Sequence, residues 1–113
     1  LAVVLGQQGQ IDEAIRQFQE VLRLKPDHAE AHYNLAVALG QKGDIGEAIR
    51  QLEETLRLKP DHVPAHNNLG TALYQQGRAG EAIRQFEEAL RLKPDYSEAR
   101  RNLDAVRAAR SRH

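Results

Sequence analysis

The sequence contains no cysteine, methionine or tryptophan, and aromatic residues occupy only 4% of its 113 positions. Without cysteine the chain cannot form a disulfide bond, a thiolate zinc site or a thiol nucleophile. No apolar run approaches the roughly 20 residues that span a bilayer, and no signal-peptide pattern is present. The formal net charge is zero, so the overall charge favours neither a nucleic acid nor a membrane surface as a partner. We therefore expect no nucleic-acid binding, no membrane insertion, and a soluble protein for which the cytoplasm is slightly favoured.

Two short segments recur along the chain with a step of 34 residues. Leu-Arg-Leu-Lys-Pro-Asp occurs at residues 22–27, 56–61 and 90–95. Glu-Ala-Ile-Arg-Gln occurs at residues 13–17, 47–51 and 81–85. A fixed period of this length is typical of solenoids, in which each repeat is one supersecondary unit stacked on its neighbours.

Each period contains two helical patterns separated by a turn. In the central repeat, apolar residues at helical spacing predict helices over about residues 29–41 and 45–58. We expect Gly43 to take the left-handed conformation that ends the first of these helices. Pro60 is expected to end the second, because proline lacks an amide donor and disfavours helical geometry in the residue before it. Strand patterns are absent, so the sequence predicts an all-α fold.

Polar residues at the predicted helix starts suggest side-chain caps. Asp44 and Glu47 have the spacing of a capping box, and Asp95 and Glu98 repeat that spacing before the last predicted helix. Asp61 is expected to cap the helix that follows Pro60.

These spaced residues resemble the tetratricopeptide repeat (TPR) family, whose pattern is W-x2-L-G-x2-Y, then A-x3-F, then P. The central repeat fills those places with His32, Leu35, Ala36, Leu39, Ala48, Leu52 and Pro60. The last repeat fills them with His66, Leu69, Gly70, Leu73, Ala82, Phe86 and Pro94. A partial first repeat contains Leu1, Ala2, Leu5, Ala14, Phe18 and Pro26. The resemblance implies a TPR alpha-alpha superhelix, a right-handed solenoid of helix–turn–helix repeats.

We expect a single TPR domain over residues 1–113, with a partial first repeat at 1–28, a second at 29–62, a third at 63–96, and a C-terminal capping helix at 97–113. Residues 1–5 read as the tail of a helix already under way, so the natural protein is expected to extend further toward the N-terminus. From Ser97 onward the sequence contains five arginines but only two acidic residues. This excess is interpreted as a solvated cap, with a functional basic patch as the alternative.

The resemblance implies that the first helix of each repeat lines a concave groove. The candidate peptide-binding residues on that face are Tyr33, Asn34, Val37, Gln41, Asn67, Asn68, Thr71, Tyr74, Gln75, Arg101 and Asn102. Asn34, Asn68 and Asn102 recur at one register, although asparagine is mildly unfavourable inside a helix. This ladder resembles the one in the TPR superhelix of O-linked N-acetylglucosamine transferases, which grips extended peptides. The alternative is that asparagine is simply common in this family's consensus, with some of these residues pairing with neighbouring helices.

A carboxylate clamp, which other TPR domains use for C-terminal EEVD-type peptides, is not matched here. The resemblance places its basic residues at positions that hold Tyr33, Val37, Pro64 and Asn68 in this chain, and Arg101 is the nearest inner-face cation. We therefore predict weak or no binding of such peptides.

Two histidine pairs have the i, i+4 spacing that zinc sites use, namely His28 with His32 and His62 with His66. No third ligand is evident, and His32 and His66 occupy the large-aromatic place, so we expect both to pack between helices. We predict no metal, no cofactor and no catalytic residue. The predicted function is a protein- or peptide-binding scaffold. The alternatives are end-on self-association through apolar residues at the N-terminal end, and a substrate-recruiting arm of a larger enzyme such as a glycosyltransferase.

Overall fold

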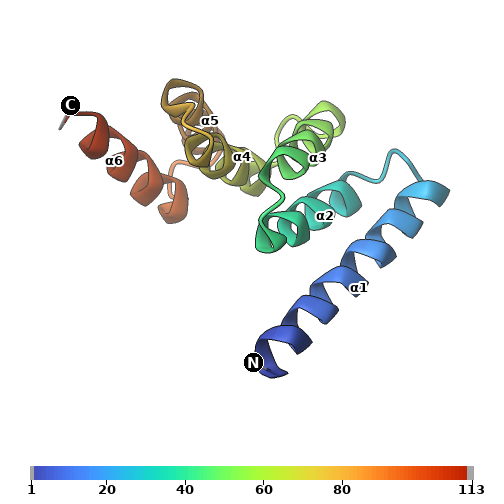
Figure 1. The fold of residues 1–113 in the computed structure, drawn as a ribbon. Helices are drawn as coiled ribbons and strands as arrows, with labels where there is room; N and C mark the ends of the chain where they lie inside the picture. The colour runs from blue at the N-terminus through green and yellow to red at the C-terminus, as the bar shows by residue number, and fades with distance from the viewer. Residues whose placement is uncertain (1, 112–113) are drawn as a thin grey trace. The chain divides into compact units, whose positions relative to one another are not determined.

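The computed structural model describes the backbone of residues 2–111 and the side chains of residues 8–111. Within that range the chain forms helices and no strand, which confirms the all-α prediction. The helices are α1 (Ala2–Leu24), α2 (Ala29–Lys42), α3 (Ile45–Leu58), α4 (Val63–Gln75), α5 (Ala79–Leu92) and α6 (Ser97–Ser111) (Figure 1). None of these helices is both long enough and apolar enough to cross a membrane. The chain divides into two compact units, residues 1–59 and 60–113.

The first unit contains α1, α2 and α3, and its centre is the helix–turn–helix pair of α2 and α3. Gly43 reverses the chain with a φ of 91°, and its amide donates to the carbonyl of Gly40. The predicted helix limits are correct to within one residue. Buried side chains of this pair include Leu35, Ala36, Leu39, Ala48, Ile49 and Leu52, which lie at helical spacing and form an apolar core.

Helix α1 differs from the expected partial repeat because it runs without a break through Gly9. Gly9 lies 34 residues before Gly43, yet Gly43 and Gly77 are the glycines with positive φ among the described residues. Gly9 does not take the left-handed conformation that ends a helix, so the helix continues through it. Leu1, Ala2 and Leu5 have side chains outside the described residues.

The second unit contains the pair α4 and α5 followed by α6. Gly77 reverses the chain with a φ of 80°. The core of this unit includes Ala65, Leu69, Ala72, Leu73, Ala82, Phe86, Ala89, Ala99, Leu103 and Val106. Helix α6 packs on α5 and on α4, and an ion pair of 2.8 Å joins Arg107 to Glu87 on α5. The side of α6 with Arg100, Asp104 and Arg107 stays exposed.

The helix caps differ from the prediction. His28 and His62 occupy the N-cap positions of α2 and α4, and the Nδ1 atom of each ring accepts a hydrogen bond of 3.1 Å from the amide of Ala31 or Ala65. The predicted cap at Asp61 is therefore wrong, because the helix starts one residue later. Asp44 does occupy a cap position, but its side chain makes no capping bond.

Glu47, the second residue of the predicted capping box, bonds to other side chains of α3. Glu47 accepts hydrogen bonds from Arg50 and from the side chain of Gln51. These contacts, with Arg50 contributing most, lower the pKa of the Glu47 carboxyl. At α6, which begins at Ser97, the amide of Arg100 donates to the carbonyl of Tyr96 at 3.3 Å, so Tyr96 rather than Asp95 directly precedes the helix.

Candidate functional site

Helix α4 buries one face and exposes a polar stripe on the other. Ala65, Leu69, Ala72 and Leu73 are buried in the second unit. The stripe consists of half-buried Asn68, exposed Thr71, exposed Gln75 and the neighbouring Tyr74, which is 42% exposed. Asn68, Thr71 and Gln75 follow helical spacing, so they lie along one side of α4.

Helix α2 has the same distribution in the first unit. Asn34 and Gln41 are exposed, while Tyr33 and Val37 are half-buried. Each of these four residues lies 34 positions before another candidate residue on α4. Those residues are Asn67, Asn68, Thr71 and Gln75. The two helices therefore expose equivalent stripes, each within its own unit. We call them the α2 stripe (Asn34, Val37, Gln41) and the α4 stripe (Asn68, Thr71, Gln75).

Asn67 and Asn102 join α4 to α6 within the second unit. The amide nitrogen of Asn102 donates to Oδ1 of Asn67 at 3.0 Å, and the amide nitrogen of Asn67 lies 3.5 Å from a carboxylate oxygen of Glu98. Asn67 is only 3% exposed. Its backbone carbonyl also accepts a hydrogen bond from Thr71 at 3.2 Å. Thr71 of the α4 stripe is therefore bonded to the backbone of its own helix. Arg101 on α6 is exposed.

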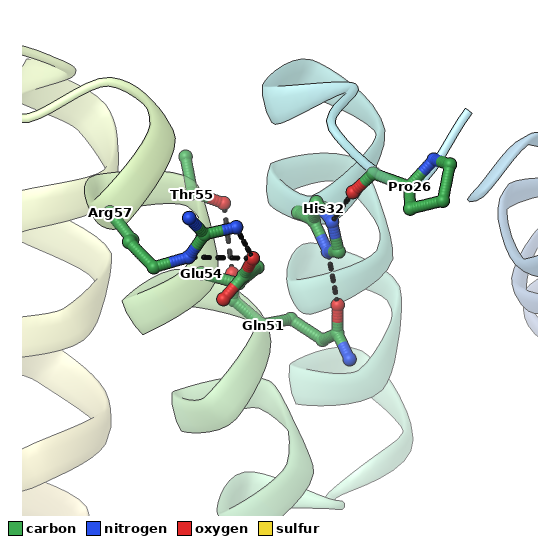
Figure 2. Close-up of polar contacts among 6 residues, drawn as sticks. All are labelled: Pro26, His32, Gln51, Glu54, Thr55 and Arg57. Carbon is green, nitrogen blue, oxygen red and sulfur yellow. Dashed lines mark hydrogen bonds and ion pairs between the residues drawn. The ribbon is translucent and has the colours of Figure 1, made fainter.

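His32 links three parts of the first unit, as Figure 2 shows. Its Nε2 atom lies 2.8 Å from the carbonyl oxygen of Pro26, and its Nδ1 atom lies 2.7 Å from Oε1 of Gln51 on α3. Gln51 is held in turn by a bond of 3.2 Å from its amide nitrogen to Glu47. His32 is 9% exposed, so this contact fixes α2 against α3 and against the end of α1.

The second unit repeats the arrangement around His66. Its Nε2 atom lies 2.7 Å from the carbonyl oxygen of Pro60, and its Nδ1 atom lies 2.8 Å from Oε1 of Gln85 on α5. The expectation that His32 and His66 pack between helices is confirmed, since His66 is 8% exposed. Both ring nitrogens of each histidine are used in these contacts. In the part of the chain that the structure describes, no three His, Asp or Glu side chains are placed to hold a metal ion.

The glutamine partners were missed by sequence reasoning. Gln51 and Gln85 each follow their histidine by 19 residues, and the repeat of that interval at a step of 34 was a visible signal. A contact between two helices, however, depends on how they pack, which a periodicity within one helix does not reveal.

The fold is similar to solved structures of helical-repeat proteins. A mutant of the O-GlcNAc transferase from Thermobaculum terrenum superposes with a TM-score of 0.82 and 30% identity over 93% of this chain, which spans only 20% of the transferase chain. MamA protein gives a TM-score of 0.83 and 26% identity over 91% of this chain and 56% of MamA. The first TPR of Spaghetti, solved with an HSP90 peptide, gives a TM-score of 0.88 at 24% identity over 93% of this chain and 83% of that one, a likeness of fold alone.

Comparison with models of protein families assigns the chain to a family. No curated protein sequence matches the chain. A model described as TPR repeat matches residues 4–43, and a model described as tetratricopeptide repeat matches residues 38–97, which is more than half of the chain. The 34-residue ladder, the helix–turn–helix pairs and the small residues at their contacts agree with this match. The chain belongs to the tetratricopeptide repeat family.

Proposed function

We propose that this chain is a non-catalytic module that binds extended segments of other polypeptides through two stripes: the α2 stripe within the first unit, and the α4 stripe, with Arg101 and Asn102 of α6, within the second. The family match supports a role in protein interaction. The finer assignment depends on one observation: the α4 stripe stays accessible to solvent while Ala65, Leu69, Ala72 and Leu73 of the same helix are buried.

The side chains of these stripes suit the main chain of a peptide. An asparagine or glutamine amide has one acceptor oxygen and two donor hydrogens, which complement the carbonyl and amide groups of an extended backbone. Such contacts depend little on the peptide's own side chains, so binding would tolerate many sequences. Tyr33 and Tyr74 would add contact area for apolar side chains.

Hydrogen bonds that hold α4 and the side chain of Thr71 in place favour a binding role for the α4 stripe over a purely structural one. Asn102 donates its amide hydrogen to Oδ1 of Asn67 and so ties α4 to α6. Thr71 is anchored to the carbonyl of Asn67. A ligand-facing side chain held in place before binding loses less conformational entropy when the ligand arrives.

A second candidate function is the recruitment of substrates to an attached enzyme. The observation that favours it is the 30% identity with the Thermobaculum terrenum O-GlcNAc transferase over 93% of this chain. Since this chain spans 20% of that protein, the likeness concerns its helical repeats. In this reading the stripes hold a substrate polypeptide, and the chemistry belongs to another domain.

The test is selection of binding peptides from a random display library with the 113-residue chain, followed by titration of the selected peptides. We expect Asn34→Ala and Asn68→Ala each to weaken binding several-fold with little change in melting temperature. Arg84→Ala on the exposed side of α5 is the control and should change neither. If binding survives in both asparagine variants while stability falls, the asparagines are structural and the proposal fails.

A further inference from the structure

Two histidine–glutamine contacts, one in each unit, have the same geometry but different surroundings. The ring of His32 meets Gln51 at 2.7 Å and the carbonyl of Pro26 at 2.8 Å (Figure 2). The ring of His66 meets its own glutamine and proline carbonyl at 2.8 and 2.7 Å. The two rings are similarly buried, at 9% and 8% exposed. In both units each ring nitrogen faces an oxygen atom, so each nitrogen needs a hydrogen to make its bond.

A single histidine ring can supply both hydrogens only when it is protonated. A neutral imidazole carries one N–H group, whereas a protonated imidazole carries two. A neutral ring that donates to the proline carbonyl therefore needs a donor for its other nitrogen. The glutamine provides that donor only if its amide group turns over and presents nitrogen in place of oxygen. This turn depends on what holds the amide nitrogen of the glutamine.

In the first unit a carboxylate holds the glutamine in the observed orientation. The amide nitrogen of Gln51 donates to Oε1 of Glu47 at 3.2 Å, while Arg50 donates to Oε2 of the same carboxylate. Turning the amide would place the Gln51 oxygen against the Glu47 oxygen, and two acceptors with no hydrogen between them repel each other. The Oε1 atom of Gln51 therefore stays directed at His32.

In the second unit an arginine engages the equivalent carboxylate. Arg78 donates to both oxygens of Glu81, at 2.9 and 2.7 Å. Arg78 lies one period after Asp44, and an aspartate cannot donate to a glutamate in this way. The hydrogen bonds of the described residues include none from Gln85 to Glu81. Glu81 thus does not fix Gln85, which can turn its amide and donate to the neutral ring of His66.

The charged groups near the two rings are otherwise alike. The pKa of the Glu54 carboxyl is lowered mainly by hydrogen bonding from Arg57, and the charge of His32 contributes less. The equivalent carboxyl of Glu88 is affected in the same way by its own arginine and by His66. The titratable residues that adjoin the rings and the proline carbonyls along the chain also match, namely Lys25 and Lys59, Asp27 and Asp61, and His28 and His62. The orientation of the glutamine is therefore what distinguishes the two histidines.

We propose that His32, unlike His66, is a proton-sensitive joint, in which uptake of a second proton by the ring strengthens the attachment of α2 to α3 and to the end of α1. Protonated His32 donates to both Gln51 and Pro26, whereas the neutral ring leaves a nitrogen lone pair facing the Gln51 oxygen. The stabilisation from this contact is present at acid pH and is lost as the pH rises and the ring releases the proton. His66 makes both bonds in its neutral form, so its contribution changes less with pH.

The first test observes the ring nitrogens of the 15N-labelled 113-residue chain by NMR, in correlation spectra that separate neutral from doubly protonated imidazoles. Loss of signals in His32→Gln and in His66→Gln assigns the two rings. As the pH falls from about 8 to about 5, His32 should acquire its second N–H group while His66 is still neutral. Simultaneous protonation of the two rings, or earlier protonation of His66, would overturn the proposal.

The second test measures the same difference as stability. Chemical denaturation gives the ratio of folding equilibrium constants between the parent and His32→Gln at one pH, which cancels the effect of acid on groups that both chains share. This ratio should be at least about fivefold larger at about pH 5.5 than at about pH 8, because a charged donor makes stronger hydrogen bonds. The ratio for His66→Gln should change less, and equal changes would contradict the proposal. If His32→Gln does not fold, the NMR titration of the parent decides, with His66→Gln assigning the rings.

Substitutions at the two equivalent positions before α3 and α5 test the cause. Asp44 and Arg78 are both exposed, so we expect their variants to fold. In Asp44→Arg the new guanidinium should draw the Glu47 carboxylate away from Gln51, and His32 should then protonate together with His66. In Arg78→Asp, His66 should acquire its second N–H group at a higher pH than in the parent. Asp44→Ala removes the acid without adding a guanidinium and should leave His32 as it is. An unchanged His32 in Asp44→Arg would overturn the proposal.

Discussion

The ring of Phe86 on α5 lies directly against the backbone of Gly70 on α4. A Cβ atom added at Gly70 would come within 2.6 Å of the Phe86 ring, which is closer than unbonded carbon atoms approach each other. In the first unit the equivalent positions hold Ala36 and Leu52. The larger side chain thus faces glycine and the smaller one faces alanine, as close packing between paired helices requires.

Gly70→Ala should therefore destabilise the protein by about 1–3 kcal/mol, the usual cost of overpacking a core. Alanine is otherwise favoured over glycine inside a helix by roughly 0.5–1 kcal/mol, so the sign of the effect tests the contact. Gly40→Ala is the matched control, because no atom lies within 4 Å of a Cβ at Gly40, and it should be neutral or stabilising. Chemical denaturation of both variants measures the difference.

The same contact predicts a rescue. Phe86→Leu in the Gly70→Ala background recreates the Ala36–Leu52 combination of the first unit and should recover part of the lost stability. A double-mutant cycle gives the coupling between the two positions. If the two single changes simply add, the ring and the backbone are not in contact.

Leu52→Ala should cost about 2–5 kcal/mol, because it leaves a cavity between α2 and α3. Leu52 is 2% exposed, so little solvent would fill the space. Leu24→Ala provides the comparison, since Leu24 is 68% exposed and its loss should barely change the melting temperature. Equal melting of the two variants would show that the inward face of α3 is assigned wrongly.

The caps give a prediction that distinguishes histidine from the aspartate before it. His28→Ala should cost about 0.5–2 kcal/mol, since α2 loses the acceptor for the Ala31 amide. His28→Asn should retain most of the stability, because asparagine is a good N-cap. Asp27→Ala should have little effect. Thermal denaturation compares the three variants, and a larger loss for Asp27→Ala than for His28→Ala would return the capping role to the aspartate.

The regular parts of the fold could be predicted because their signals are local. Apolar spacing located α2 and α3 to within one residue, and Gly43 and Pro60 lie where the chain must stop being helical. The repeat step then transferred the same limits to α4 and α5. The exposure of Asn34 and Gln41 on α2 followed from the same spacing.

Features that depend on contacts between helices, or on a single residue of register, could not be predicted. His28 and Asp27 are both polar residues before a helix, and only the observed start at Ala29 decides which one caps it. The Asn67–Asn102 bond requires α6 to lie beside α4, which no pattern within either helix indicates. Likewise Gly9 lies one period before the turn at Gly43, but a turn forms only where the helices on both sides of it pack together.

The glutamate–arginine pairs on α1, α3 and α5 predict a modest dependence of stability on pH. Hydrogen bonding from Arg57 to Glu54, visible in Figure 2, lowers the pKa of the Glu54 carboxyl, and the Arg57 charge adds to this. A lowered pKa in the folded state means that the pair stabilises the fold above the ordinary glutamate value of about 4.3. That stabilisation is lost as the pH falls through the folded value.

NMR titration of the side-chain carboxyl can measure this effect directly. In Arg57→Gln the pKa of Glu54 should rise toward its ordinary value, while Glu20, which pairs with Arg23, should titrate as before. The Arg57 side chain is 65% exposed and that of Glu54 is 34% exposed, so loss of the pair should cost only about a few tenths of a kcal/mol. Added salt should reduce the difference between the variant and the parent. An unchanged Glu54 titration would contradict the ion pair.

The places that the resemblance assigns to a carboxylate clamp lack cations. This predicts that the peptide SRMEEVD, with which the first TPR of Spaghetti was solved, binds this chain weakly or not at all. The positions where a clamp would need cations hold Tyr33, Val37, Pro64 and Asn68, none of which is charged. Arg101 alone would attract a carboxylate only weakly, because a single exposed ion pair contributes roughly 0–1 kcal/mol. Titration by calorimetry should give no saturation, and amidation of the peptide's C-terminus should change nothing. A micromolar dissociation constant that amidation or Arg101→Ala removes would show that a clamp exists after all.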